Sequence, residues 1–256
     1  LAEKVAQHSE QLFFHIVYVG TDPVIENYLR YKQRFAESIG VTIVIHRFAE
    51  DVSQEELQEE VRHVSDADQP MIIQLPLPKH FDTQLILNSV PRHLDVDVLS
   101  SEARFLYSRG ESLFIPPVVG SIVEVFDYYN VDLVDKKIVV VGEGMLVGLP
   151  MTFWLDLNGY KYHVVTKDTA SSEKKEALSS ADVVVSGAGV ANLISINDVK
   201  EGIVIIDAGT SESGSRIVGD VDVSVKEKSS LFTPVPGGIG PLTIAVLYRN
   251  VVTSYV

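Results

Sequence analysis

The chain has 256 residues, 46% of them hydrophobic, with 21 basic and 35 acidic side chains for a net charge of −14, and it contains no cysteine. It is long enough for one large or two modest soluble domains, and no run approaches the roughly 20 apolar residues of a membrane span. The negative charge argues against nucleic acid as a partner, and the lack of cysteine, which suits a reducing cytoplasm, excludes disulfides, thiolate catalysis and cysteine-bound zinc.

In the first half of the chain, apolar runs of strand length alternate with helical patterns. Asp22-Pro23 is a good helix start, because aspartate is a favoured N-cap and proline fits the first helical turn. This alternation is typical of βαβ units with a mainly parallel sheet. The expected strands are 13–19, 41–45 and 71–75, and the expected helices lie near 24–39 and 53–66.

Candidate acid/base residues occur in this half. Tyr28 and Lys32 are four residues apart on an expected helix, so the phenol and the ammonium share one face. Gln74 ends a buried strand at the carboxyl edge, where α/β proteins place their sites, and Asp95-Val96-Asp97 follows Pro91. The alternatives are a surface lysine lying along an aromatic ring and structural or solvated aspartates.

A second series of strands follows a join near Pro116-Pro117 and an expected helix at about 119–130. Its strands are 137–141, 162–165, 182–185 and 203–207, and an apolar helix follows near the end of the chain. We predict a two-domain α/β protein. One domain spans 1–118 and is completed by the C-terminal helix at 240–256, and a Rossmann-type domain spans 119–239.

The turn after strand 137–141 has the features of a dinucleotide site. Gly142, Gly144 and Gly148 lie between this strand and an apolar helix whose first turn contains Pro150. Such a turn lets the backbone and the helix-terminal amides approach a pyrophosphate. The alternative is a merely tight turn.

The type of nucleotide depends on charges near this turn. An acid directly after the strand at 162–165 favours a cofactor with a free ribose 2′-hydroxyl, and a cation there favours one with a 2′-phosphate. Lys167 therefore favours a 2′-phosphate, whereas Asp168 favours a free 2′-hydroxyl. Glu143 disfavours the additional phosphate unless Lys167 offsets its charge. A solvated loop is the alternative for both Lys167 and Asp168.

The segment from Thr233 to Thr243 contains three prolines and three glycines. Proline fixes φ and removes an amide donor, while glycine allows positive φ and a close approach to the backbone. This density favours a rigid ligand-binding loop over a structural turn.

Together these motifs resemble the bifunctional methylenetetrahydrofolate dehydrogenase/methenyltetrahydrofolate cyclohydrolase family over essentially the whole chain. The resemblance implies a folate cleft between a catalytic domain and a Rossmann-type NAD(P)-binding domain, in a cytoplasmic homodimer of one-carbon metabolism that needs no metal. The motifs are Tyr28 to Lys32, Gln74 to Pro78, Asp95-Val96-Asp97, Val147-Gly148 with Pro150, Gly219-Asp220-Val221, and Thr233 to Thr243.

The resemblance also implies roles for single residues. Lys32 matches the catalytic lysine of the cyclohydrolase step, and Gln74 matches the glutamine that tunes it. Tyr28 matches the tyrosine that positions the lysine and binds the substrate by stacking near the pterin ring. Asp97 matches the acid that holds the pterin ring. The implied folate-pocket loop contains Gly238, Gly240 and Pro241, and the implied cofactor-binding residues are Gly142, Glu143, Gly144, Gly148, Lys167 and Thr210.

The chain departs from the family pattern in several places. The usual G-R-S turn reads Gly142-Glu143-Gly144, so NADP is expected but NAD is possible. Leu94 replaces a lysine, Val98 replaces a glycine, and the segment at the domain junction reads Ile115-Pro116-Pro117-Val118. These departures keep open a monofunctional dehydrogenase or a non-catalytic folate- or nucleotide-binding protein. The short segment before the first strand and the opening Leu1 suggest an incomplete start.

Overall fold

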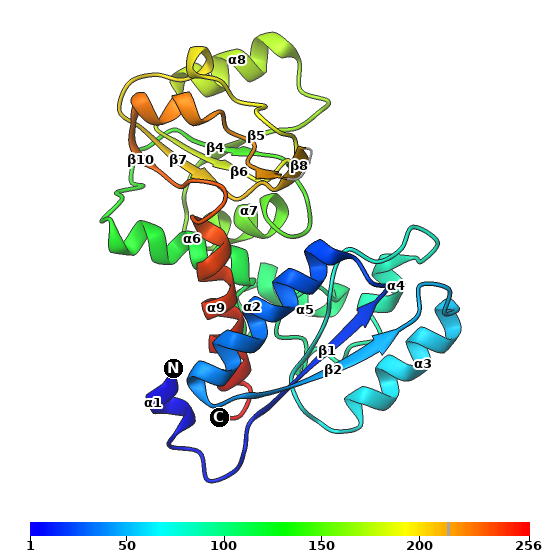
Figure 1. Ribbon diagram of the computed structural model, residues 1–256. Coiled ribbons are helices and arrows are strands. Elements are labelled where there is room, and N and C mark those ends of the chain that lie inside the picture. Colours follow the sequence, from blue (N-terminus) through cyan, green and yellow to red (C-terminus); the bar gives the residue numbers. More distant parts are fainter. Residues whose placement is uncertain (214–215) are drawn as a thin grey trace. The chain divides into compact units, whose positions relative to one another are not determined.

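The computed structural model describes residues 1–213 and 216–256, which form two compact units, each with its own parallel sheet (Figure 1). Unit 1 comprises Leu1–Pro116 and Ile244–Val256, and unit 2 comprises Pro117–Thr243. The predicted two-domain α/β class is confirmed. From the sequence, we expected the domain boundaries between residues 118 and 119 and between residues 239 and 240. The cleft expected between the domains stays a prediction.

Unit 1 is built on a three-stranded sheet of order β2-β1-β3, with both pairs parallel. The central strand is buried from Phe14 to Val19, as expected for a parallel strand covered on both faces. The strands are β1 (Phe13–Val19), β2 (Thr42–Phe48) and β3 (Met71–Ile73). The helices are α1 (Ala2–Val5), α2 (Pro23–Ile39), α3 (Gln54–Ser65), α4 (Thr83–Leu87) and α5 (Ser101–Ser108).

Helix α2 begins where the sequence predicts. Asp22 Oδ1 accepts hydrogen bonds from the backbone N of Val24 at 2.7 Å and of Ile25 at 3.3 Å, and Pro23 occupies the first turn. The helix ends at Gly40, whose φ of 82° is left-handed. Both ends are therefore fixed by local sequence, which sets the position of the side chains along the helix.

Unit 2 has a parallel five-stranded sheet of order β10-β7-β6-β4-β5 and an antiparallel hairpin of β8 and β9. The sequence did not reveal β10, which pairs with β7. The strands are β4 (Ile138–Val141), β5 (Tyr162–Val165), β6 (Val183–Ser186), β7 (Ile203–Asp207), β8 (Ser211–Ser213), β9 (Arg216–Val218) and β10 (Ser229–Phe232). The helices are α6 (Pro117–Tyr128), α7 (Gly148–Leu157) and α8 (Ser171–Ser180), with 3-10 turns η1 (Ile196–Asp198) and η2 (Val223–Glu227).

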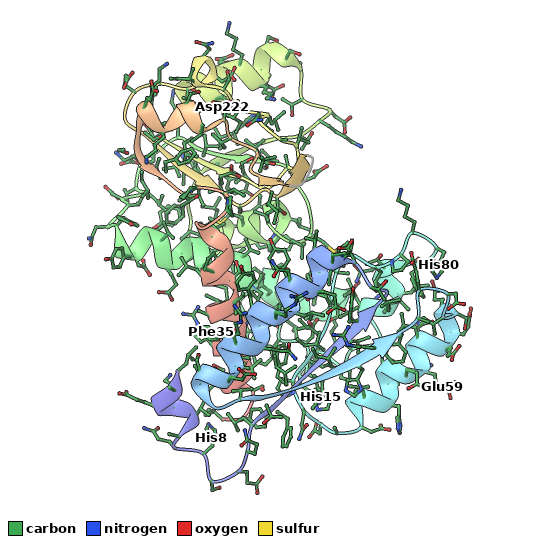
Figure 2. The ribbon with its side chains drawn as sticks, viewed as in Figure 1. His8, His15, Phe35, Glu59, His80 and Asp222 are labelled. Atoms are coloured by element: carbon green, nitrogen blue, oxygen red, sulfur yellow. The ribbon has the colours of Figure 1, made fainter. Side chains whose placement is uncertain are left out.

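The last helix, α9 (Ile239–Thr253), begins in unit 2 and continues as part of unit 1 from Ile244. In unit 1 the ring of Tyr248 lies 5.5 Å from that of Phe14 and 5.2 Å from that of Phe35, between ring centres. Figure 2 labels Phe35 on α2, on the side of α2 next to α9. This aromatic contact attaches the end of the chain to the first helix of the βαβ units. In the two described ranges, no helix has the length and apolar character needed to cross a membrane.

Candidate active site

Lys32 and Gln74 meet through their side chains. Lys32 Nζ donates a hydrogen bond of 2.8 Å to Gln74 Oε1. Gln74 directly follows β3, and its backbone N donates to the carbonyl oxygen of Val17 at 2.8 Å, which anchors it to β1. Its Nε2 donates to the carbonyl oxygen of Leu75 at 2.7 Å, so the amide oxygen is left to face the lysine. Two of the four acid/base candidates are therefore brought together.

Asp97 interacts electrostatically with the same lysine. Burial lowers the pKa of the Lys32 ammonium from 10.5 to about 8, and attraction to Asp97 opposes that shift. Burial raises the pKa of the Asp97 carboxyl from 3.8 to about 6, with Lys32 opposing the rise and Asp95 adding to it. A lysine and an acid with pKa values moved toward neutrality are what proton transfer near pH 7 requires.

The two aspartates of Asp95-Val96-Asp97 differ in their surroundings. Asp95 is 3% exposed, and its Oδ2 accepts from the backbone N of Leu99 at 3.0 Å and of Ser100 at 2.7 Å. Asp95 therefore holds the loop. Val98, directly after Asp97, has a φ of 60°, which is strained for a β-branched residue and which the glycine expected there from the resemblance would adopt without strain.

Tyr28 lies one turn before Lys32 on α2, and it is 36% exposed. Burial of its ring raises the pKa of its phenol above the ordinary value. The ring is thus partly open to a ligand. The proposed stacking of Tyr28 near the pterin stays a prediction.

The glycine turn after β4 has no space for side chains at two of its positions. A Cβ on Gly148 would lie 2.0 Å from the carbonyl oxygen of Gly142, and a Cβ on Gly142 would lie 2.9 Å from the Cα of Ala188. Gly142 also has a φ of 92°. Gly144 has more room, since a Cβ there would lie 3.8 Å from the carbonyl oxygen of Gly187. The turn is therefore packed against the loop after β6, and it leads into the amino end of α7.

Sequence reasoning assigned no role to the residues that support this edge of the sheet. Asp220 Oδ2 accepts from Ser186 Oγ at 2.7 Å and from the backbone N of Ala188 at 2.6 Å, and its Oδ1 accepts from the backbone N of Val190 at 2.8 Å. Asp220 therefore fixes the loop after β6. Polar Ser186 and Asp207 at the ends of buried strands were a signal that could have revealed this support.

The other cofactor candidates lie in the same region of unit 2. Lys167 follows β5, Thr210 follows β7, and both are exposed, as is Glu143 in the glycine turn. Because the sheet is parallel, these segments share its carboxyl edge, where α/β proteins bind ligands. Individual contacts of Lys167, Thr210 and Glu143 with a cofactor stay predictions.

The proline-glycine loop follows β10 and leads into α9. The backbone N of Gly238 donates to the carbonyl oxygen of Pro234 at 2.7 Å, and a Cβ on Gly238 would lie 2.6 Å from that oxygen. Gly240 has open space around its Cα, and Pro241 is exposed in the first turn of α9. The backbone of the loop therefore forms a tight hydrogen-bonded turn at Gly238, with no space for a side chain. Gly240 and Pro241 are accessible.

A separate cavity of about 910 Å³ lies at the opposite edge of the unit 2 sheet, around the amino ends of β4 and β5. Lys137, Tyr160 and Tyr162 are among its lining residues. It is remote from the glycine turn along both strands, so we do not assign the dinucleotide to it. The part of the chain that the structure describes contains no group of three or more metal-ligating side chains.

Comparison with known proteins identifies the family. Residues 1–97 match the family model described as the tetrahydrofolate dehydrogenase/cyclohydrolase catalytic domain, and residues 116–256 match the NAD(P)-binding domain of the same family. The chain belongs to the tetrahydrofolate dehydrogenase/cyclohydrolase family. The resemblance read from the sequence motifs is thereby confirmed.

Relatives within this family are similar over most of their length. The bifunctional protein FolD of Nautilia profundicola is 37% identical over 93% of this chain and 85% of its own, and that of Aquifex aeolicus is 35% identical over 94% and 83%. The crystal structure of FolD from Campylobacter jejuni has a TM-score of 0.92 at 32% identity, covering 99% of this chain and 92% of that one. FolD from Trypanosoma brucei, complexed with NADP and an inhibitor, has a TM-score of 0.93 at 27% identity, covering 99% and 91%.

These findings give the activity of the chain. As a member of the tetrahydrofolate dehydrogenase/cyclohydrolase family it is an NAD(P)-dependent methylenetetrahydrofolate dehydrogenase and a methenyltetrahydrofolate cyclohydrolase. It oxidises methylenetetrahydrofolate to the methenyl form and hydrolyses that product to formyltetrahydrofolate. The bifunctional enzyme expected from the motifs is confirmed.

Proposed function

We propose that Lys32 is the acid/base residue of the cyclohydrolase step, that Gln74 and Tyr28 position it, and that Asp97 binds the pterin ring. The observation that carries this proposal is the hydrogen bond from Lys32 Nζ to Gln74 Oε1, made by a lysine that also interacts with Asp97. The alternative of a surface lysine lying along an aromatic ring does not explain this bond.

The residue types fit the chemistry. Hydrolysis adds water to the methenyl carbon, which requires removal of a proton from the attacking water. Neutral Lys32 accepts that proton, which leaves a hydroxyl group on the one-carbon unit. The resulting ammonium donates a proton to the ring nitrogen when its bond to the one-carbon unit breaks, and the hydroxyl proton is released to solvent as the formyl C=O forms. A lysine with a pKa of about 8 has a usable neutral fraction near pH 7.

Replacing Gln74 with alanine is expected to lower cyclohydrolase kcat/KM about 10-fold. The ammonium loses an acceptor, and a hydrogen bond to a charged group contributes about 1.5–3 kcal/mol. The measurement is the decay of methenyl absorbance in the ultraviolet. Gln58→Ala on α3 is a matched control, because Gln58 bonds instead to the carbonyl oxygen of Leu85 and to Ser89. Equal hydrolysis rates in the two variants would exclude a role for Gln74.

The proline-glycine loop is proposed as one wall of the folate pocket. Gly240 and Pro241 are the accessible members of the loop, and Gly238 gives it a closed backbone turn. The loop offers no titratable side chain between Pro234 and Pro241, so it positions the substrate and does not transfer a proton.

The glycine turn is proposed to hold NADP. Gly142 and Gly148 pack directly against neighbouring backbone, and this close packing leaves the turn beside the amino end of α7, whose amides can bind a pyrophosphate. Lys167 after β5 supplies a cation for a 2′-phosphate, and the Trypanosoma brucei relative binds NADP. When bound, the nicotinamide accepts the hydride from the methylene carbon. NAD is the competing cofactor, because Glu143 and Asp168 are acidic.

Replacing Lys167 with alanine is expected to lower kcat/KM for NADP about 10-fold and leave that for NAD within about 2-fold, because only NADP carries the phosphate that the ammonium would bind. Initial rates with both cofactors on one preparation provide the measurement. Lys175→Ala on α8 is the control, since Lys175 is exposed and remote in sequence from the glycine turn. Equal losses with NADP and NAD would contradict 2′-phosphate binding by Lys167.

We further propose a cytoplasmic homodimer. The lack of cysteine suits a reducing compartment. Tyr128 and Tyr129 at the end of α6 are 78% and 58% exposed, and exposed aromatic side chains of this kind favour a protein interface. Light scattering of the purified protein measures the mass, and the mass of one chain at micromolar concentration would contradict the dimer.

A further inference from the structure

Helix α9 carries two polar side chains that are almost completely buried. Tyr248 is 0% exposed and Asn250 is 3% exposed, in the part of α9 that belongs to unit 1. Buried polar groups are retained where they form hydrogen bonds, because an unpaired group is costly. Both side chains bond to backbone carbonyls outside α9, and these carbonyls include those of Lys32 and of the residue before Asp97.

The hydroxyl of Tyr248 donates to the carbonyl oxygen of Lys32 at 2.9 Å. Lys32 lies in the interior of α2, so this bond is additional to the helix ladder. The ring is held between Phe14 and Phe35, which fixes the direction of the hydroxyl. Tyr248 therefore holds the backbone of the residue whose ammonium contacts Gln74.

The amide of Asn250 binds the loop that contains Asp95-Val96-Asp97, which we call the aspartate loop. Its Nδ2 donates to the carbonyl oxygen of Val96 and to that of Ile115, both at 2.8 Å. The Val96 carbonyl belongs to the peptide bond that joins Val96 to Asp97. Asp95 fixes the same loop on the other side through the backbone N of Leu99 and of Ser100. The backbone at Asp97 is thus held from both directions.

The two contacts come from different sides of α9. Residues two positions apart are separated by about 200° around a helix with 3.6 residues per turn. Tyr248 and Asn250 therefore reach α2 and the aspartate loop from roughly opposite faces, with the rigid backbone of α9 between them. Loss of either contact would release one of these two backbone segments relative to the other.

We propose that Tyr248 and Asn250 are positioning residues for the reaction, and that α9 sets the separation between Lys32 and Asp97. This inference rests on the proposed roles of Lys32 and Asp97. The interaction of the two charged groups varies with their distance, so a change in spacing alters the protonation of both. A misplacement of about 1 Å can reduce a rate about 100-fold.

The test compares Tyr248→Phe with Tyr255→Phe. Each substitution removes one hydroxyl that donates to a backbone carbonyl of unit 1, since the Tyr255 hydroxyl bonds to the carbonyl oxygen of Phe13 at 2.7 Å. Tyr248→Phe is expected to lower cyclohydrolase kcat about 10-fold with little change in KM, and to shift the pH profile of hydrolysis. Tyr255→Phe is expected to leave kcat and the pH profile at wild-type values, whatever its effect on Tm.

Asn250→Leu is expected to lower cyclohydrolase kcat about 100-fold, because the carbonyls of Val96 and Ile115 lose their donor and the loop at Asp97 is released. Asn250→Gln keeps an amide on a longer side chain, and it tests the same position if the leucine variant does not fold. An intermediate kcat and a shifted pH profile are expected for it.

Two results would separate the possible failures. If Lys32→Met retains hydrolysis, the proposed catalytic role of Lys32 is wrong. If Lys32→Met abolishes hydrolysis but Tyr248→Phe and Asn250→Gln change only Tm, with wild-type kcat and pH profile, the positioning role is wrong and the catalytic assignment stands.

Discussion

Lys32→Met is expected to abolish methenyl hydrolysis, with a loss of about 10²–10⁴-fold in cyclohydrolase kcat, because the substitution removes the only group to which we assign proton transfer. Methionine has a similar length and apolar stem, so the packing of α2 should be retained. Dehydrogenase activity is expected to persist, since hydride transfer requires orientation of two ligands and no proton from Lys32. The methenyl product should therefore accumulate, and its ultraviolet absorbance measures that accumulation.

Lys175→Met is the matched control, because Lys175 is an exposed lysine on α8 and the same substitution there should leave both activities unchanged. Hydrolysis at the wild-type rate in Lys32→Met would remove Lys32 from the mechanism. Loss of both activities together with a large fall in Tm would indicate unfolding, and Lys32→Arg would then test the role with the positive charge retained.

The pH profile gives a second measure of the same role. The pKa of Lys32 is lowered to about 8, so its neutral, proton-accepting fraction increases as the pH rises through that value. Enzymatic hydrolysis, after subtraction of the uncatalysed rate, is expected to increase between pH 7 and 9. A flat profile across this range would contradict general-base catalysis by Lys32.

Local sequence was sufficient for much of the fold. The N-cap at Asp22 and the proline after it fixed the start of α2, and apolar runs of strand length located the strands around them. Each of these signals acts over a few residues, so no tertiary contact is needed to read it. The missed strand β10 (Ser229–Phe232) contains two serines, and its pairing with β7 is what makes it a strand.

The site shows the opposite case, where contacts distant in sequence decide the role of a residue. The sequence placed Lys32 and Gln74 at suitable positions, but their hydrogen bond spans 42 residues. Family resemblance, and not the spacing in Asp95-Val96-Asp97, singled out Asp97, and the structure supplies the physical difference through the loop contacts of Asp95. The bonds of Tyr248 and Asn250 join the last helix to the first hundred or so residues, which local periodicity does not encode.

The glycine turn yields the last prediction, because its three glycines differ in the space around them. Gly148→Ala is expected to weaken dinucleotide binding about 100-fold and to lower dehydrogenase kcat/KM by a similar factor. The added Cβ would lie 2.0 Å from the carbonyl oxygen of Gly142, which is backbone and must move. That movement displaces the turn that we propose as the cradle for the pyrophosphate. Titration calorimetry with NADP measures the affinity.

Gly144→Ala is the matched control, because it makes the same substitution two residues after Gly142 where the nearest atom would lie 3.8 Å from the Cβ. It is expected to keep dinucleotide affinity within about 5-fold of wild type. Cyclohydrolase activity, assigned to residues of unit 1, should persist in both variants and shows that the chain is folded. Equal affinity for NADP in the two variants would place the pyrophosphate away from this turn. If only Gly148→Ala loses NADP affinity and hydrolysis is intact, the dehydrogenase and cyclohydrolase activities depend on different parts of the chain. Lys32→Met is the converse experiment, because it removes hydrolysis and leaves dehydrogenation.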